Sequence, residues 1–174
     1  MRTLLCRLSC FDLVLFQLLQ CDERLLLCRV FLFLNACKNS LAEAVVEFSS
    51  HVSPQQRSAN LTAFCNGACK VLVASDAMTR GMDIPSVANI VNYDAPVHTT
   101  TYLHRVGRSA RAGQSGRAVT LLRHEDVRHF KSMLRKVDNA YVKDYAIPSE
   151  LLVELKEPCQ DALAATHKKL LDDL

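Results

Sequence analysis

The chain has 174 residues, a net charge of +3 and 49% hydrophobic residues, which supply a sizeable core and exclude a largely disordered or collagen-like protein. It contains no run of about 18 apolar residues, so we expect neither a membrane-spanning helix nor a membrane partner. None of its eight cysteines belongs to a CxxC pair, and this spacing does not favour structural zinc. We therefore expect no metal site, and read most of the cysteines as small buried residues in a reducing compartment.

The first 28 residues are rich in leucine and cysteine. A charged start followed by an apolar run is typical of a weak signal peptide, but Asp12 interrupts the run. We favour an amphipathic helix that packs on the domain, with a non-native start of the chain as a further alternative. We place a single domain at residues 29–140 and a helical acidic tail at residues 141–174.

Strand-length apolar runs alternate with helical patterns after this segment. We predict strands at residues 29–34, 70–75, 89–93 and 117–122, and either a short helix at 39–46 or a strand at 45–48. We predict helices from Pro54 to Asn66, at 99–109, at 124–137 and on either side of Pro158 in the tail. The alternation predicts an α/β fold, a parallel sheet with helices on both faces.

Positive charge is concentrated in the middle of the chain. Residues 80–136 carry 10 basic and 4 acidic side chains, a net charge of +6, whereas residues 1–79 carry +1 and residues 137–174 carry −4. The central segment is therefore suited to meet an anion, and the tail is not.

The loop at residues 75–85 is the first candidate for a binding site. Ligands of an open parallel sheet bind beyond the carboxyl ends of its strands, and this loop follows a predicted strand. Gly81 permits close backbone approach, Arg80 suits a phosphate, and Asp83 could accept a hydrogen bond from a ribose hydroxyl. The alternative is an ordinary loop in which Asp76 caps a helix.

Two further segments are expected at the same edge of the sheet. In residues 92–96 we expect Asp94 to have a structural role. In residues 104–113, His104, Arg108 and Arg111 share one face of the predicted helix. Stacked cations repel each other unless an anion lies opposite, and two arginines aimed at one point suit phosphoryl transfer. A solvated basic face is the alternative, but it would not need glycine at three nearby positions.

The motifs TRGMD, NYDAP and HRVGRSARAG, in this order and at this spacing, resemble the second RecA-like domain of DEAD-box RNA helicases. The resemblance covers roughly residues 29–137. The stretches EFSSHVSPQQR and SDAMTRGMD are similar to the branch that acts in nucleolar ribosome assembly. The resemblance implies a RecA-like fold, RNA and ATP with magnesium as ligands, and a location in the nucleus and nucleolus, with the cytoplasm as the alternative. Pre-ribosomal proteins are further implied partners.

The resemblance also implies roles for individual residues. It implies RNA contacts at Arg57, Ser75, Thr79, Arg80 and Gly81. It implies contacts with ATP at Gly81 and Asp83, and it makes Arg108 and Arg111 the catalytic arginine fingers that reach the γ-phosphate. His104 and Arg105 would be the interdomain residues: His104 would link to an acidic motif of the first RecA-like domain, and Arg105 would brace the site.

The chain departs from the family pattern in several places. The GxxxxGK[ST] phosphate loop, the DEAD tetrapeptide and the glutamine motif do not occur in its sequence. All three belong to the first RecA-like domain, so we expect that domain to hold ATP and magnesium and this chain to be inactive alone. Residues 35–47 are too few for the usual helix and strand, which predicts a truncated first βα unit. Pro54 stands where the family often has glutamine, which would remove one RNA contact.

These observations leave three hypotheses on function. The first is the C-terminal half of an ATP-dependent DEAD-box RNA helicase in ribosome biogenesis, which binds the RNA backbone and supplies arginine fingers. The second is a non-catalytic RNA-binding module or a regulatory short isoform. The third, suggested only by the N-terminus, is a secreted cysteine-rich factor.

Overall fold

The computed structural model describes residues 14–18, 45–76, 87–110, 113, 115–137 and 142–145, together with a set of residues in the tail, namely 149–150, 153, 156–157, 160–161, 163–165 and 168. Their elements are β1 (Val14–Leu18), β2 (Val45–Phe48), α3 (Pro54–Cys65), β3 (Val71–Ser75), β4 (Asn89–Asn92), α5 (Thr99–Val106), β5 (Arg117–Thr120) and α6 (Asp126–Arg135).

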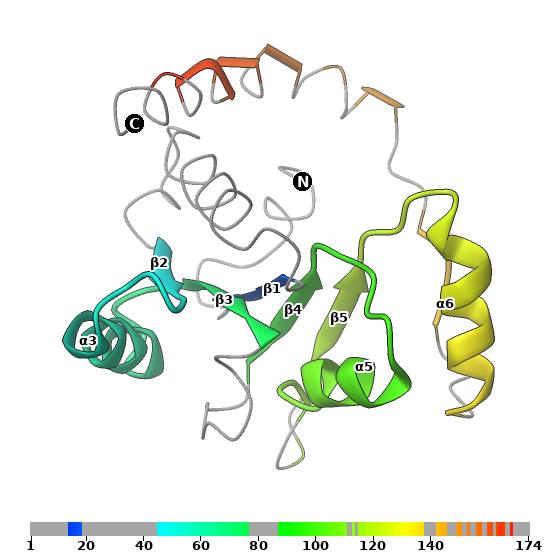
Figure 1. Cartoon of the computed structure of the whole chain (residues 1–174), viewed down its shortest axis with the longest axis horizontal. Helices are drawn as coiled ribbons and strands as arrows, with labels where there is room; N and C mark the ends of the chain where they lie inside the picture. Colours follow the sequence, from blue (N-terminus) through cyan, green and yellow to red (C-terminus); the bar gives the residue numbers. More distant parts are fainter. Residues whose placement is uncertain are drawn as a thin grey trace.

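The strands form one sheet in the order β2-β3-β1-β4-β5, and every neighbouring pair is parallel. Parallel neighbours need crossover connections, which α3 provides between β2 and β3 and α5 between β4 and β5. Both helices lie on the same side of the sheet (Figure 1). The structure confirms the predicted α/β fold with a parallel sheet. A helix on the opposite face stays a prediction.

Strand β1 corrects the interpretation of the N-terminal segment. Its residues pair with β3 on one side and with β4 on the other, so it is the central strand of the sheet. The prediction of a helix in residues 1–28 is wrong for these five residues, and a domain that starts at residue 29 omits a strand that the sheet contains. A short continuous apolar run suits a doubly buried strand as well as a helix, and its length favours the strand. The strand predicted at residues 29–34 lies outside the described residues.

Strand β2 decides between the two predictions for its segment. Val45 and Val46 are extended, which confirms the strand and contradicts a helix that continues to residue 46. Residues 39–44, where that helix would begin, lie outside the described residues, as does most of the segment predicted to be too short.

Helix α3 begins and ends where its sequence predicts. The Ser53 hydroxyl accepts a hydrogen bond from the Gln56 amide at 3.3 Å, and Pro54 occupies the first turn. Asn66 caps the helix, and Gly67 follows with φ of +77°, a conformation that glycine adopts without strain. Phe64 of this helix is fully buried. It packs in a core with residues of β2, β3 and β4 and of the chain just before β4, namely Phe48, Leu72, Ala74, Val87 and Ile90.

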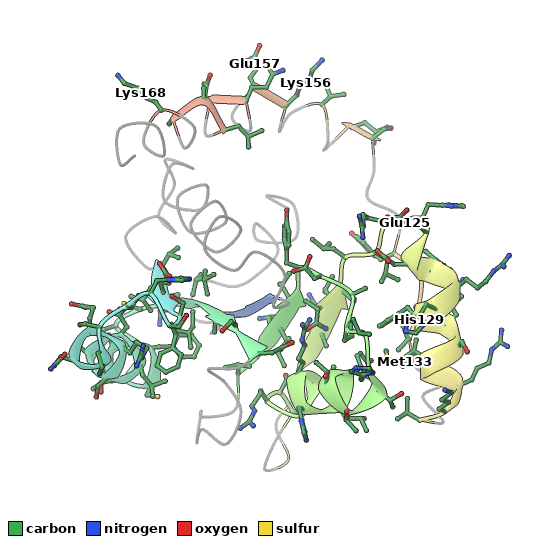
Figure 2. All side chains as sticks on the ribbon, in the orientation of Figure 1. Glu125, His129, Met133, Lys156, Glu157 and Lys168 are labelled. Carbon is green, nitrogen blue, oxygen red and sulfur yellow. The ribbon has the colours of Figure 1, made fainter. Side chains whose placement is uncertain are left out.

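A second apolar cluster joins α5 to α6. Phe130, Met133 and Leu134 of α6 pack with Tyr102 of α5, whose ring meets that of Phe130 edge to face at a centroid distance of 5.6 Å. Figure 2 shows Met133 on the side of α6 that faces α5. The cluster packs α6 against α5.

The tail is helical at its described positions on both sides of Pro158, as predicted, and these positions are exposed. Lys156, Glu157 and Lys168 point away from the domain (Figure 2). An ion pair of 3.2 Å between Lys131 Nζ and Asp144 Oδ2 connects α6 to the chain that follows. Among the described residues, no helix is both long and apolar enough to cross a membrane.

Candidate functional site

A buried ion pair between Arg105 and Asp76 lies at the centre of the candidate site. Arg105 Nε donates to Asp76 Oδ1 at 2.8 Å, and Nη2 donates to Oδ2 at 2.7 Å. The remaining nitrogen, Nη1, donates to the carbonyl oxygen of Asp94 at 2.9 Å. Arg105 is 1% exposed and the Asp76 side chain 10%, so water hardly screens the attraction.

These hydrogen bonds join three segments that are far apart in sequence. Asp76 follows β3, Asp94 follows β4, and Arg105 lies on α5. All three contacts use the Arg105 guanidinium within the fold. The bracing role that the resemblance implies for Arg105 stays a prediction. The Asp76 carboxylate, for which a helix cap was the alternative role, accepts two of these hydrogen bonds.

Helix α5 ends earlier than predicted, and this changes the geometry of the basic motif. Gly107 caps the helix after Val106, and Ala110 adopts a positive φ of 55°. The expectation that His104, Arg108 and Arg111 share one helical face is therefore wrong for Arg108, which lies beyond the last helical residue. His104 is exposed in the last turn of α5, Arg108 is half-buried, and Arg111 lies outside the described residues.

The residues after Arg108 also lie at an unexpected place on the sheet. Ser109 forms a parallel bridge with Val87, which precedes β4, and the Val87 amide donates to the Arg108 carbonyl at 3.1 Å. The motif therefore reaches the amino end of β4. The prediction that all three candidate segments gather at the carboxyl ends holds for Asp76 and Asp94 and is wrong for Ser109.

Of the residues predicted to contact RNA, the structure describes Ser75 and Arg57. Ser75 is buried at the end of β3. Arg57 on α3 is half-buried, and its Nη1 donates to the carbonyl oxygens of Val52 at 2.8 Å and Ser49 at 3.2 Å. This contact ties α3 to the turn before it. The other predicted ligand-binding positions, Thr79, Arg80, Gly81 and Asp83, lie outside the described residues.

Sequence reasoning missed Ser109 as a residue of this site. Its hydroxyl donates to the Val87 carbonyl at 2.7 Å, and it is 8% exposed. The glycine at position 116 is the sequence signal that points to this contact. A Cβ atom there would lie 1.9 Å from the Ser109 hydroxyl oxygen, so a side chain would not fit. The part of the chain that the structure describes contains no group of three side chains able to hold a metal ion.

The chain was compared with known proteins. The family model for the helicase conserved C-terminal domain matches residues 20–113. ATP-dependent RNA helicase DDX51 of Mus musculus is 36% identical over 178 residues, which cover 97% of this chain and 27% of the relative. DEAD-box ATP-dependent RNA helicase 1 of Arabidopsis thaliana is 44% identical over 128 residues, with 74% and 23% covered. The chain thus spans about a quarter of the length of these relatives.

A solved structure of Mss116p DEAD-box helicase domain 2, bound to an RNA duplex, matches with a TM-score of 0.69. It is 19% identical, and the match covers 99% of this chain and 70% of that one. At this identity the match establishes the fold, which is that of a RecA-like helicase domain.

Proposed function

Because the chain belongs to the helicase conserved C-terminal domain family, in its DEAD-box branch, we propose that it acts as the C-terminal half of an ATP-dependent RNA helicase. In this role it contributes half of an RNA-binding groove and supplies arginine fingers to ATP bound by a first RecA-like domain. The observation that carries the proposal is the buried pair between Asp76 and Arg105, which joins the residue directly after β3 to α5, the helix that precedes Arg108.

RNA binding rests on residues that face phosphate and sugar. The segment at residues 77–86 contains Thr79, Arg80 and Gly81, which are suited to backbone contacts that do not depend on sequence. The related domain of Mss116p was solved with an RNA duplex, which supports RNA as the ligand class. Neutralising phosphates releases counterions, so the affinity falls as salt is raised.

Catalysis rests on two arginines that follow α5. Arg108 and Arg111 reach the γ-phosphate and stabilise the charge that develops on it, while Gly81 and Asp83 contact the nucleotide from the preceding segment. ATP with magnesium supplies the phosphoryl group, and the first domain holds both. His104 is exposed in the last turn of α5, and we assign it the link to an acidic group of that domain. Arg105 remains a brace, since its three hydrogen bonds are made within this fold.

The cellular role that we propose is ribosome biogenesis in the nucleolus, with pre-ribosomal RNA and proteins as partners. The support is the resemblance of its motif-flanking stretches to that branch. The second candidate function is a non-catalytic RNA-binding or regulatory module.

The test is ATP hydrolysis by this chain when the first RecA-like domain of the mouse relative is fused to its N-terminus. We expect no hydrolysis by the chain alone and RNA-stimulated hydrolysis by the fusion. Arg108→Lys and Arg111→Lys should each reduce the rate about 10³-fold, the lower end of the effect of an arginine finger. Arg128→Lys, at an exposed position on α6, is the matched control and should leave the rate unchanged.

Each other outcome has a defined meaning. RNA binding by the chain without hydrolysis by the fusion would favour the regulatory module. Hydrolysis by the chain alone would contradict the division of the site between two domains. Failure of both RNA binding and hydrolysis would reject the proposed function.

A further inference from the structure

Ser53 is the only serine or threonine in the sequence that is followed by proline. It is exposed, and so are the three residues after it. Its backbone has φ of −57° and ψ of 151°, the extended polyproline conformation that a following proline favours. Proline has no amide hydrogen, so an enzyme groove that offers no acceptor at this position selects proline over other residues. Ser53 thus combines the sequence, the exposure and the backbone conformation that proline-directed kinases accept.

The first turn of α3 is weakly held and carries no negative charge. The Ser53 hydroxyl accepts from the Gln56 amide at 3.3 Å, which is long for a hydrogen bond of this kind. A turn held in this way opens readily into the groove of an enzyme. No acidic residue lies in the turn, so no side chain there offsets the partial positive charge of the helix N-terminus. A negative group on Ser53 would therefore meet backbone N–H groups without repulsion from an acid of the same turn.

Arg57 lies one turn further along α3, and its guanidinium reaches back beside Ser53. Its Nη1 donates at 2.8 Å to the Val52 carbonyl, which belongs to the peptide bond with Ser53, and at 3.2 Å to the Ser49 carbonyl. Among the residues that the structure describes, no carboxylate forms an ion pair with Arg57. Glu47, the acid closest to it in sequence, accepts instead from the Ser49 hydroxyl. A positive charge that no described carboxylate balances thus lies next to Ser53.

We propose that Ser53 is a phosphorylation site for a proline-directed serine/threonine kinase, and that the N-terminus of α3 and Arg57 together hold the phosphate. In the kinase, Ser53 Oγ forms a bond to the γ-phosphorus of ATP while the bond from that phosphorus to the β–γ bridging oxygen breaks. ADP leaves, and the hydroxyl proton passes to the catalytic base of the kinase. The product carries a charge of about −1.5 to −2 at pH 7 and three acceptor oxygens. These oxygens accept from the Gln56 amide and from the Arg57 guanidinium.

Phosphorylation has a consequence for RNA that rests on the proposed function, in which Arg57 contacts an RNA phosphate. A phosphate on Ser53 occupies the same guanidinium and repels the RNA backbone. We expect the affinity for single-stranded RNA to fall about tenfold, the equivalent of one charge-assisted hydrogen bond. Because Pro54 stands where the family often has glutamine, this regulation is a property of the chain and not of the common family pattern.

The phosphorylation site is tested with the full chain, a mitogen-activated protein kinase, ATP and magnesium, followed by mass spectrometry of the intact chain and its peptides. We expect one phosphate, on Ser53, and its loss in Ser53→Ala. Pro54→Ala keeps the acceptor and should also lose most of the incorporation. Ser58→Ala, at an exposed serine of α3 that no proline follows, is the control and should accept phosphate as the unmodified chain does. No phosphate on Ser53 of the folded chain would overturn the proposal, even if a peptide of residues 47–61 is modified.

Urea unfolding of the phosphorylated chain tests how the phosphate is held. Phosphorylation should raise the unfolding midpoint by about 0.5 M, because the phosphate pairs with the helix N-terminus and with Arg57. In Arg57→Gln the rise should be roughly halved. A midpoint that is unchanged or lower would reject the holding of the phosphate by α3, and an equal rise in Arg57→Gln would reject the role of Arg57.

Binding of a single-stranded uridine oligonucleotide, measured at one salt concentration, separates this site from the proposed function. The phosphorylated chain should bind about tenfold more weakly than the unphosphorylated chain. Equal affinities would reject the regulation of RNA binding. If the unphosphorylated chain binds no RNA, the proposed function fails, whereas the incorporation on Ser53 and the shift of the urea midpoint are measured without RNA and still decide the phosphorylation site.

Discussion

Removing Arg105 tests whether the buried ion pair holds the site together. Arg105→Ala deletes three hydrogen bonds of 2.7 to 2.9 Å and removes this cation from beside the Asp76 carboxylate, which is 10% exposed. Removing one partner of a buried pair typically costs about 3–5 kcal/mol. With a denaturant dependence of about 2 kcal/mol per molar urea, the unfolding midpoint should fall by about 2 M.

The double variant Asp76→Ala/Arg105→Ala completes the cycle. It removes both charges, so its free energy of unfolding should fall by less than the sum of the two single effects, with a coupling energy of about 1–3 kcal/mol. Arg123→Ala is the matched control, because Arg123 pairs with Glu125 and Asp126 while its side chain is 78% exposed. Its midpoint should not change measurably. Additive single effects, or an Arg105→Ala cost below about 1 kcal/mol, would refute the argument that this pair joins the segments.

Further predictions concern the ends of α3 and the core beneath α5. Ser53→Ala removes the helix cap and should lower the free energy of unfolding by about 1 kcal/mol, measured by urea titration. Gly67→Ala places a side chain at φ of +77° and should lower the free energy of unfolding by about 1 kcal/mol. The control Ser58→Ala, at an exposed position of α3, should not lower the free energy of unfolding. Burial raises the pKa of Tyr102, so its proton is held more tightly in the folded state. The stability linked to this group is present below pH of about 10 and is lost as the pH rises through the folded pKa. Tyr102→Phe should therefore flatten the alkaline loss of stability seen in thermal unfolding.

Elements with local start and stop signals could be predicted from the sequence. Helix α3 follows from Ser53 and Pro54 at its start and Asn66 with Gly67 at its end, and the structure places it there. Strands β3, β4 and β5 lie within the segments predicted as strands at residues 70–75, 89–93 and 117–122. The sequence did not identify strand β1, because periodicity alone does not distinguish a short apolar run in a strand from one in a helix. The choice is made by pairing with β3 and β4, whose residues lie more than fifty positions away in sequence.

The candidate site was harder to predict because its contacts are distant in sequence. Asp76 and Arg105 are 29 positions apart, and Val87 and Ser109 are 22 apart. Neither pair produces a recognisable pattern in the sequence around its two residues. The basic motif itself predicted a helix through Ser109, but Ser109 has a partner on another segment that competes with continuation of α5. Glycine at position 116 was a local sign of a close contact, but it did not identify the partner.

The arginines of the basic motif show why residue type, and not charge alone, determines what each position does. Arg105 makes two parallel hydrogen bonds to one carboxylate and a third to a carbonyl on a different segment. A planar guanidinium can do this with one rigid group, whereas the ammonium group of lysine would have to break the paired contact with Asp76 to reach Asp94. The charge of Arg105 is balanced within the fold, so it does not add to the positive charge that a bound anion meets. The net charge of +6 in residues 80–136 therefore overstates the attraction of this segment for RNA or nucleotide.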